Sequence, residues 1–123
     1  MCIRDSRFPN LLYQINVRTL LLRTYYRLFE QDVSYYSLLI TQCESFIKFL
    51  QRNHQLNENK KQAMLLFPKL LKSIAETQFA NKFDVQKKQH FIEIINRSNG
   101  VSLKGWLLEI LHNLDKKNLN NKE

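Results

Sequence analysis

Turn-forming residues are scarce in this sequence of 123 residues, which contains only two glycines and two prolines. Antiparallel sheets need frequent tight turns, and those turns depend on glycine, proline and asparagine. The scarcity therefore argues against a sheet protein. Leucine, lysine, glutamine and glutamate are plentiful instead, and all four are good helix formers. The composition predicts an all-α fold.

Cysteine is also scarce, and one of the two cysteines lies in an unusual N-terminal segment, "MCIRDS". Residues 1–6 resemble the translated end of a sequencing adapter, and on this interpretation the natural chain continues upstream of Arg7 and the sequence is a C-terminal fragment. The alternative is an ordinary, frayed N-terminus. We therefore expect residues 1–6 to be an artefact, 7–116 to form a helical domain and 117–123 to be a polar tail.

Without that leader, Cys43 is the remaining cysteine, and a single cysteine forms no internal disulfide. This favours a reducing, cytoplasmic location. Cys43 stands among apolar residues in "LLITQCESFIKFL", which indicates a buried, unreactive thiol.

Long hydrophobic runs are absent as well. The apolar runs, such as "TLLL" and "MLLF", are far shorter than the roughly 20 residues that span a bilayer. No signal peptide is visible. We expect no membrane contact in this part of the protein.

The first predicted helix covers residues 10–29, or two shorter helices if Asn16 interrupts it. Apolar residues recur at spacings of three and four, which places them on one face. Three arginines, Arg18, Arg23 and Arg27, fall toward the other side. The predicted core face consists of Val17, Leu20, Leu21, Thr24, Tyr25 and Leu28.

The second and third predicted helices cover residues 34–52 and 58–79. Asp32 or Ser34 is suited to cap the former, and Asn57 the latter. Pro68 either kinks the third helix or starts a new one, and the unbroken apolar spacing favours the kink. The two predicted core faces are Tyr36, Leu39, Ile40, Cys43, Phe46, Ile47 and Leu50, followed by Ala63, Leu66, Phe67, Leu70, Leu71 and Ile74.

Two further helices are predicted over residues 83–97 and 103–114. Gly100 suits the left-handed position after the fourth helix, and Ser102 the cap of the fifth. The polar residues after the fifth helix are expected to fray. The predicted core faces are Phe91, Ile94 and Ile95, followed by Trp106, Leu107, Ile110, Leu111 and Leu114. Short connectors between five or six helices predict antiparallel hairpins.

The segment "LLLRTYYRLFEQD" resembles the first helix of a tetratricopeptide repeat, in which Leu21, Tyr25 and Leu28 match packing positions. Leu22 and Phe29 depart from that pattern, which has small residues there. The order of residues from Arg18 to Leu111 is also similar to the C-terminal part of an uncharacterised bacterial family of longer, all-helical proteins. The resemblance implies an α-solenoid with tetratricopeptide-like helical pairs, and it implies no activity.

Few residues suggest catalysis or metal binding. Glu109 and His112 share one helical face, as in di-metal bundles, but such bundles need a second copy of that motif. His90 and Glu93 have the reverse order, so we expect no metal and no cofactor. No glycine-rich phosphate loop and no nucleophile with an arranged base are recognisable. We expect a protein that is not an enzyme.

Positive charge is in excess, with a net charge of +8. A basic helical surface can bind nucleic acid through its phosphates, so a nucleic-acid-binding module is the alternative function. The lysines are interleaved with glutamates, however, which is typical of a solvated face. The lysines of this candidate basic surface are Lys60, Lys61, Lys69, Lys72, Lys87, Lys88, Lys116 and Lys117.

Stacked helical pairs usually bind proteins or peptides. A protein-protein interaction scaffold, or the C-terminal cap of a solenoid, is therefore the leading expectation. Its partner surface is predicted at Arg23, Tyr26 and Arg27 on the first helix.

Overall fold

The computed structural model describes the backbone of residues 2–98 and 103–121, and the side chains of residues 10–98 and 103–114. The described residues form five α-helices and one short 3-10 helix, and they include no strand. The all-α prediction is confirmed. In chain order the elements are α1 (Cys2–Gln31), η1 (Val33–Tyr35), α2 (Tyr36–Arg52), α3 (Glu58–Phe79), α4 (Val85–Arg97) and α5 (Lys104–Asn121).

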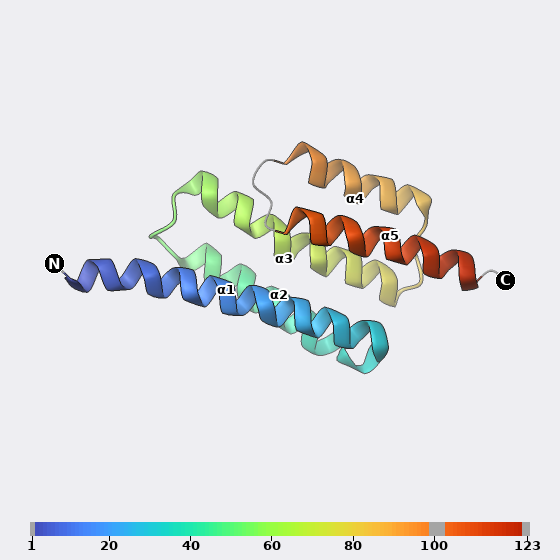
Figure 1. The fold of residues 1–123 in the computed structure, drawn as a ribbon, viewed down its shortest axis with the longest axis horizontal. Coiled ribbons are helices and arrows are strands. Elements are labelled where there is room, and N and C mark those ends of the chain that lie inside the picture. The colour runs from blue at the N-terminus through green and yellow to red at the C-terminus, as the bar shows by residue number, and fades with distance from the viewer. Residues whose placement is uncertain (1, 99–102, 122–123) are drawn as a thin grey trace.

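Successive helices run in alternating directions, and each connection between them is short (Figure 1). α2 contacts both α1 and α3, and α4 pairs with α5. Figure 1 shows α1 and α2 together on one side of the molecule and α4 at the opposite edge. The predicted antiparallel hairpins are therefore present.

Polar side chains fix where several elements begin. Asp32 accepts a hydrogen bond of 3.0 Å from the backbone N–H of Ser34 and so caps η1, which leads directly into α2. Asn57 caps α3 as predicted, by accepting from the N–H of Lys60 at 2.8 Å. Each cap satisfies a backbone donor that the helix leaves unpaired. The predictions for Gly100 and Ser102 concern positions outside the described residues.

The two long helices, α1 and α3, continue without a break through Asn16 and Pro68. α1 passes Asn16 without interruption, which excludes the alternative of two shorter helices. α3 likewise contains Pro68 within a single helix, which excludes the alternative of a new helix starting at that proline. Proline removes one backbone hydrogen bond. The Pro68 ring is itself buried on the apolar face of α3. Burial of this apolar ring offsets the missing hydrogen bond.

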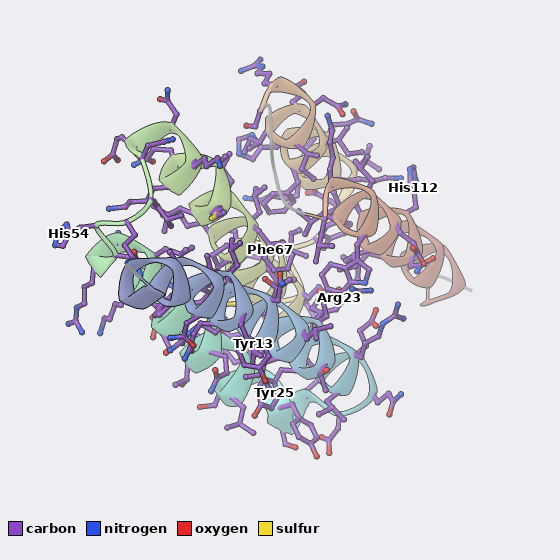
Figure 2. The ribbon with its side chains drawn as sticks, turned by 60° about the vertical axis from the view of Figure 1, so that its left-hand side comes forward. Tyr13, Arg23, Tyr25, His54, Phe67 and His112 are labelled. Atoms are coloured by element: carbon purple, nitrogen blue, oxygen red, sulfur yellow. The ribbon has the colours of Figure 1, made fainter. Side chains whose placement is uncertain are left out.

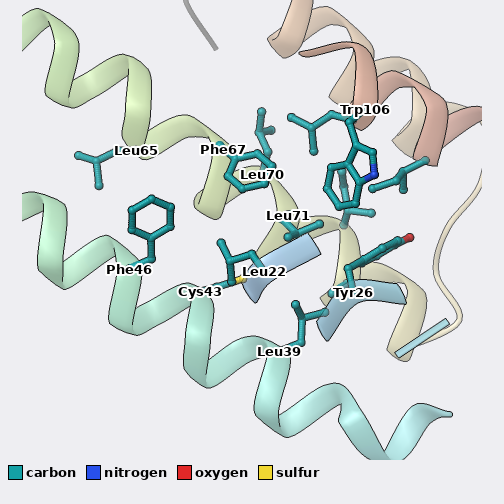
Figure 3. Packing of buried hydrophobic residues seen from close by; sticks show 14 of the residues in the cluster. Leu22, Tyr26, Leu39, Cys43, Phe46, Leu65, Phe67, Leu70, Leu71 and Trp106 are labelled. Carbon is teal, nitrogen blue, oxygen red and sulfur yellow. The ribbon is translucent and has the colours of Figure 1, made fainter. Parts of the chain in front are cut away.

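The predicted core faces of α2, α3 and α5 lie in one hydrophobic cluster (Figure 3). Leu39, Leu71 and Leu111 are completely buried. The other predicted members are buried or half-buried in the same cluster, except Ala63, which is half-buried outside it. Each of these three helices has a single apolar stripe. Burial of that stripe determines which face of the helix packs inward.

The face that α1 turns inward differs in part from the predicted one. Tyr25 packs against the cluster as predicted, but the prediction is wrong for Leu20 and Leu21. Leu20 is 58% exposed and Leu21 is 38% exposed, whereas Leu22 and Tyr26 are completely buried. α1 carries apolar residues on most of its circumference, so its periodicity permits two inward faces. Packing of α1 against α2 and the contact of Tyr26 with Trp106 of α5 select the face that contains Tyr26.

Aromatic rings join α1, α3 and α5 in the middle of the cluster (Figure 3). The ring of Trp106 lies 5.8 Å from that of Tyr26, in a T-shaped arrangement, and 6.0 Å from that of Phe67. Edge-to-face pairs at these distances stabilise a core beyond the area that they bury. Trp106 thus connects α5 to both α1 and α3.

The C-terminal helices differ from the prediction at three places. α4 begins at Val85 rather than near Phe83. Lys88, predicted on a solvated basic face, is buried beside Phe91 and Ile95, because its methylene stem continues their apolar stripe. α5 continues to Asn121, so the segment predicted to fray is largely helical in its backbone.

Candidate ligand-binding groove

The three residues predicted to form a partner surface do not share one. Tyr26 is completely buried, and its hydroxyl donates a hydrogen bond of 2.7 Å to Oε1 of Gln78 on α3. Arg23 is half-buried beside α5, with its guanidinium carbon 5.4 Å from the centre of the Trp106 ring (Figure 2). Of the three, Arg27 alone is exposed. Tyr26 is a core residue, and the predicted surface must be corrected.

The electrostatics of Tyr26 agree with its position in the core. Burial, and secondarily the nearby carboxylate of Glu30, raise the pKa of the Tyr26 hydroxyl far above its ordinary value. The hydroxyl therefore stays neutral and acts as a donor to Gln78 at any physiological pH.

A hollow of about 550 Å³ instead opens on another side of the α1–α2 pair. A second hollow of about 390 Å³ shares Arg18, Phe49 and Asn53 with it. We call the two together the α1–α2 groove. Its lining residues are Asn10, Leu11, Gln14 and Arg18 of α1, Thr41, Glu44, Ser45, Lys48, Phe49 and Arg52 of α2, and Asn53 and Gln55 of the following connector.

Helical spacing explains why α2 presents polar residues to this groove. Thr41, Ser45, Lys48 and Arg52 follow one another at intervals of three or four, which places them along one face. The buried stripe of α2 lies on the opposite side of the helix. Hydrophobic packing of α2 therefore leaves a row of hydroxyl and cationic groups directed outward.

Arg18 of α1 completes the groove and lies against two α2 residues. Its guanidinium carbon is 4.3 Å from the centre of the Phe49 ring, and its Nη1 donates to Oγ of Ser45 at 3.2 Å. Its Nε is buried and has no hydrogen-bond partner. A guanidinium has five N–H donors, and an unpartnered buried donor is unfavourable. Arg18 is thus held by Ser45 and Phe49, and its guanidinium still has N–H donors without a partner.

The groove is electropositive. Arg18, Lys48 and Arg52 contribute three cations, while Glu44 contributes the only carboxylate among its lining residues. Glu44 Oε2 lies 3.4 Å from Nζ of Lys72 on α3, so that charge is already paired. The arrangement favours a ligand that brings negative charge.

The lysines predicted as a basic surface are not equivalent in the structure. Lys72 pairs with Glu44, Lys88 is buried, and Nζ of Lys61 donates to the backbone carbonyl of Gln51 at 3.4 Å. Lys60 and Lys69 are exposed on α3. The described lysines therefore do not form one continuous charged path, and the side chains of Lys116 and Lys117 lie outside the described residues.

The other residues whose side chains could act as nucleophiles, acids, bases or metal ligands lie far apart. Burial raises the pKa of the Cys43 thiol to about 12, so this cysteine is protonated as well as buried. His54 is exposed at one end of the molecule, and His112 is exposed on α5 at the other (Figure 2). Glu109 is exposed as well. Among the residues that the structure describes, no three histidine, cysteine, aspartate or glutamate side chains gather where they could hold a metal ion.

Within the described part of the chain, no helix combines the length and the apolar character needed to cross a membrane. No protein-family model, curated protein or solved structure matches the sequence.

Sequence reasoning missed the groove, although part of its signal is visible. The polar row on α2 can be identified from its spacing alone. Arg18, however, was assigned only to the outer side of its helix, and its contacts with Ser45 and Phe49 join residues far apart in the sequence. Those contacts depend on how α1 packs on α2, which the local pattern does not encode.

Proposed function

We propose that this chain is a non-catalytic helical module that binds a segment of another protein in the α1–α2 groove. The observation that carries the proposal is the combination of three cationic side chains with hydroxyl, amide and phenyl groups in one open hollow. Protein recognition sites typically combine an aromatic or arginine anchor with polar groups that pair with the partner.

The architecture supports the same proposal. Antiparallel helical pairs stacked side by side present extended surfaces for peptides, and we propose that these pairs belong to an α-solenoid. A position at the C-terminal end of such a solenoid, in a reducing cytoplasm, completes the proposal. Nucleic-acid binding is the less favoured reading, because the cations outside the groove are paired, buried or scattered.

Selection from a phage-displayed library of random peptides tests this function. The immobilised protein should enrich a restricted set of peptides at moderate salt. The double variant Lys48→Ala/Arg52→Ala should lose that enrichment, because it removes two of the groove's cations. A matched double variant, Lys60→Ala/Lys69→Ala, removes two exposed lysines of α3 and should retain it.

The proposal fails if no peptide is enriched, or if both double variants lose enrichment to the same extent. It also fails if mixed-sequence DNA displaces the selected peptides at moderate salt. Binding to a phosphate backbone weakens steeply as salt rises, so such displacement would favour the nucleic-acid reading.

A further inference from the structure

We infer that the α1–α2 groove takes an acidic peptide segment and that Arg18 binds a carboxylate side chain of that segment. The inference rests on the proposed function and names the chemistry of the ligand. It follows from the unused donors of Arg18, the position of its guanidinium over Phe49 and the charges around it.

Two of the unused donors lie side by side on one edge of the guanidinium. Nη1 is engaged with Ser45, whereas Nε has no partner and shares its edge of the group with Nη2. That edge matches the two oxygens of a carboxylate, which accept two parallel N–H bonds from arginine. Because Nε is covered in the present conformation, we expect ligand entry to turn the guanidinium toward the groove.

Phe49 and Ser45 position the guanidinium beside the groove. The 4.3 Å separation places the cation over the Phe49 ring, and Nη1 donates a hydrogen bond to Ser45. Lysine at the same position would keep the charge but would lose the planar fork.

The surroundings favour a short acidic peptide over a long polyanion. Lys48 and Arg52 add two cations beside Arg18, and Thr41 and Asn53 offer hydrogen bonds to a peptide backbone. Outside the groove, Lys72 is paired with Glu44 and Lys88 is buried. A ligand with a few closely spaced carboxylates matches this limited area of positive charge.

Fluorescence anisotropy with labelled peptides from the phage selection tests the inference. The selected peptides should contain aspartate or glutamate. Replacement of those residues by asparagine or glutamine should weaken binding about tenfold or more, because a charged hydrogen bond becomes neutral. Arg18→Ala should cause a similar loss and Arg18→Lys a smaller one. Arg27→Ala is the matched control, because Arg27 is an exposed arginine of the same helix, and it should leave affinity unchanged. A thermal melt followed by circular dichroism confirms that each variant is folded.

Each contrary outcome has a distinct meaning. If no peptide binds, the inference falls together with the proposed function. If peptides bind equally well after their carboxylates are neutralised, the groove still binds peptides but the inference is overturned. If Arg27→Ala weakens binding as much as Arg18→Ala, the effect is one of net charge and the role of Arg18 is overturned. If a single-stranded oligonucleotide competes better than the acidic peptides at moderate salt, the acidic ligand is overturned in favour of a nucleic acid.

Discussion

Two arginines of α1 make the same kind of contact in two very different places. Arg18 lies over Phe49, and Arg23 lies over Trp106. The Trp106 ring is 9% exposed and packs between Tyr26 and Phe67 in the core. The Phe49 ring is half-buried and borders an open hollow.

The difference separates a structural contact from a binding contact. At Arg23 the cation covers a ring that is already surrounded by apolar partners, so the contact contributes to packing between α1 and α5. At Arg18 the ring orients a cation that has an unpartnered donor. We therefore expect changes around Arg23 to affect stability and changes around Arg18 to affect binding.

Replacing the two rings should show the largest contrast. Trp106→Ala should lower the free energy of unfolding by about 3–5 kcal/mol, because it removes a large buried side chain from the centre of the cluster. Phe49→Ala should cost clearly less, because that ring is only half-buried. Urea unfolding followed by circular dichroism measures both, since Trp106 is the single tryptophan and its loss removes the fluorescence signal. An equal loss of unfolding free energy in the two variants would contradict the distinction between a core ring at Trp106 and a groove ring at Phe49.

A smaller effect is expected at the hydrogen bond behind Trp106. Tyr26→Phe removes the donor to Gln78 and should cost about 0.5–1.5 kcal/mol. A double-mutant cycle with Gln78→Ala isolates the bond, because the two side chains touch and their effects should not add. Strict additivity would show that the pair contributes nothing.

Replacing the arginines themselves sharpens the comparison further. Arg23→Ala should lower stability by about 0.5–1 kcal/mol, the usual size of a cation–aromatic contact near the surface. Arg18→Ala should lower it less, because the substitution also removes an unpartnered buried donor. Unfolding curves give the two stabilities. An Arg18→Ala cost larger than that of Arg23→Ala would contradict the assignment of Arg18 to binding.

The smallest effect on stability at neutral pH is expected from ionisation of Cys43, which is buried on the inner face of α2. The folded pKa of about 12 exceeds the ordinary value of 9.0, so the folded state binds the proton more tightly than the unfolded state between these values. Stability should therefore be unaffected at neutral pH and should fall as pH rises above 9.0. Reaction with a thiol reagent should likewise be slow in the folded protein and fast in urea. Rapid reaction of the folded protein would place Cys43 outside the core.

Much of the fold could be predicted from local patterns. α2, α3 and α5 each carry one apolar stripe, and each turned that stripe inward. The Asn57 cap was also predictable, because an asparagine side chain satisfies the backbone donors of a helix that begins after it.

The errors have a common cause in contacts between distant residues. Leu20, Leu21 and Leu22 make α1 apolar on several sides, and packing against α2 and Trp106 of α5 decides which side is covered. The same error placed Tyr26 on the surface. The groove escaped prediction for a related reason, since Arg18 acquires its role only when α1 packs against α2.

The most direct test of the central claim is a ¹H–¹⁵N NMR titration with a selected acidic peptide, observing the arginine Nε–H signals. The Arg18 signal is assigned from its absence in Arg18→Lys, and those of Arg23 and Arg27 in the same way. We predict that the Arg18 Nε–H signal moves downfield and saturates with the peptide while those of Arg23 and Arg27 stay in place. A titration that moves the Arg23 or Arg27 signal and leaves that of Arg18 unchanged would contradict the account.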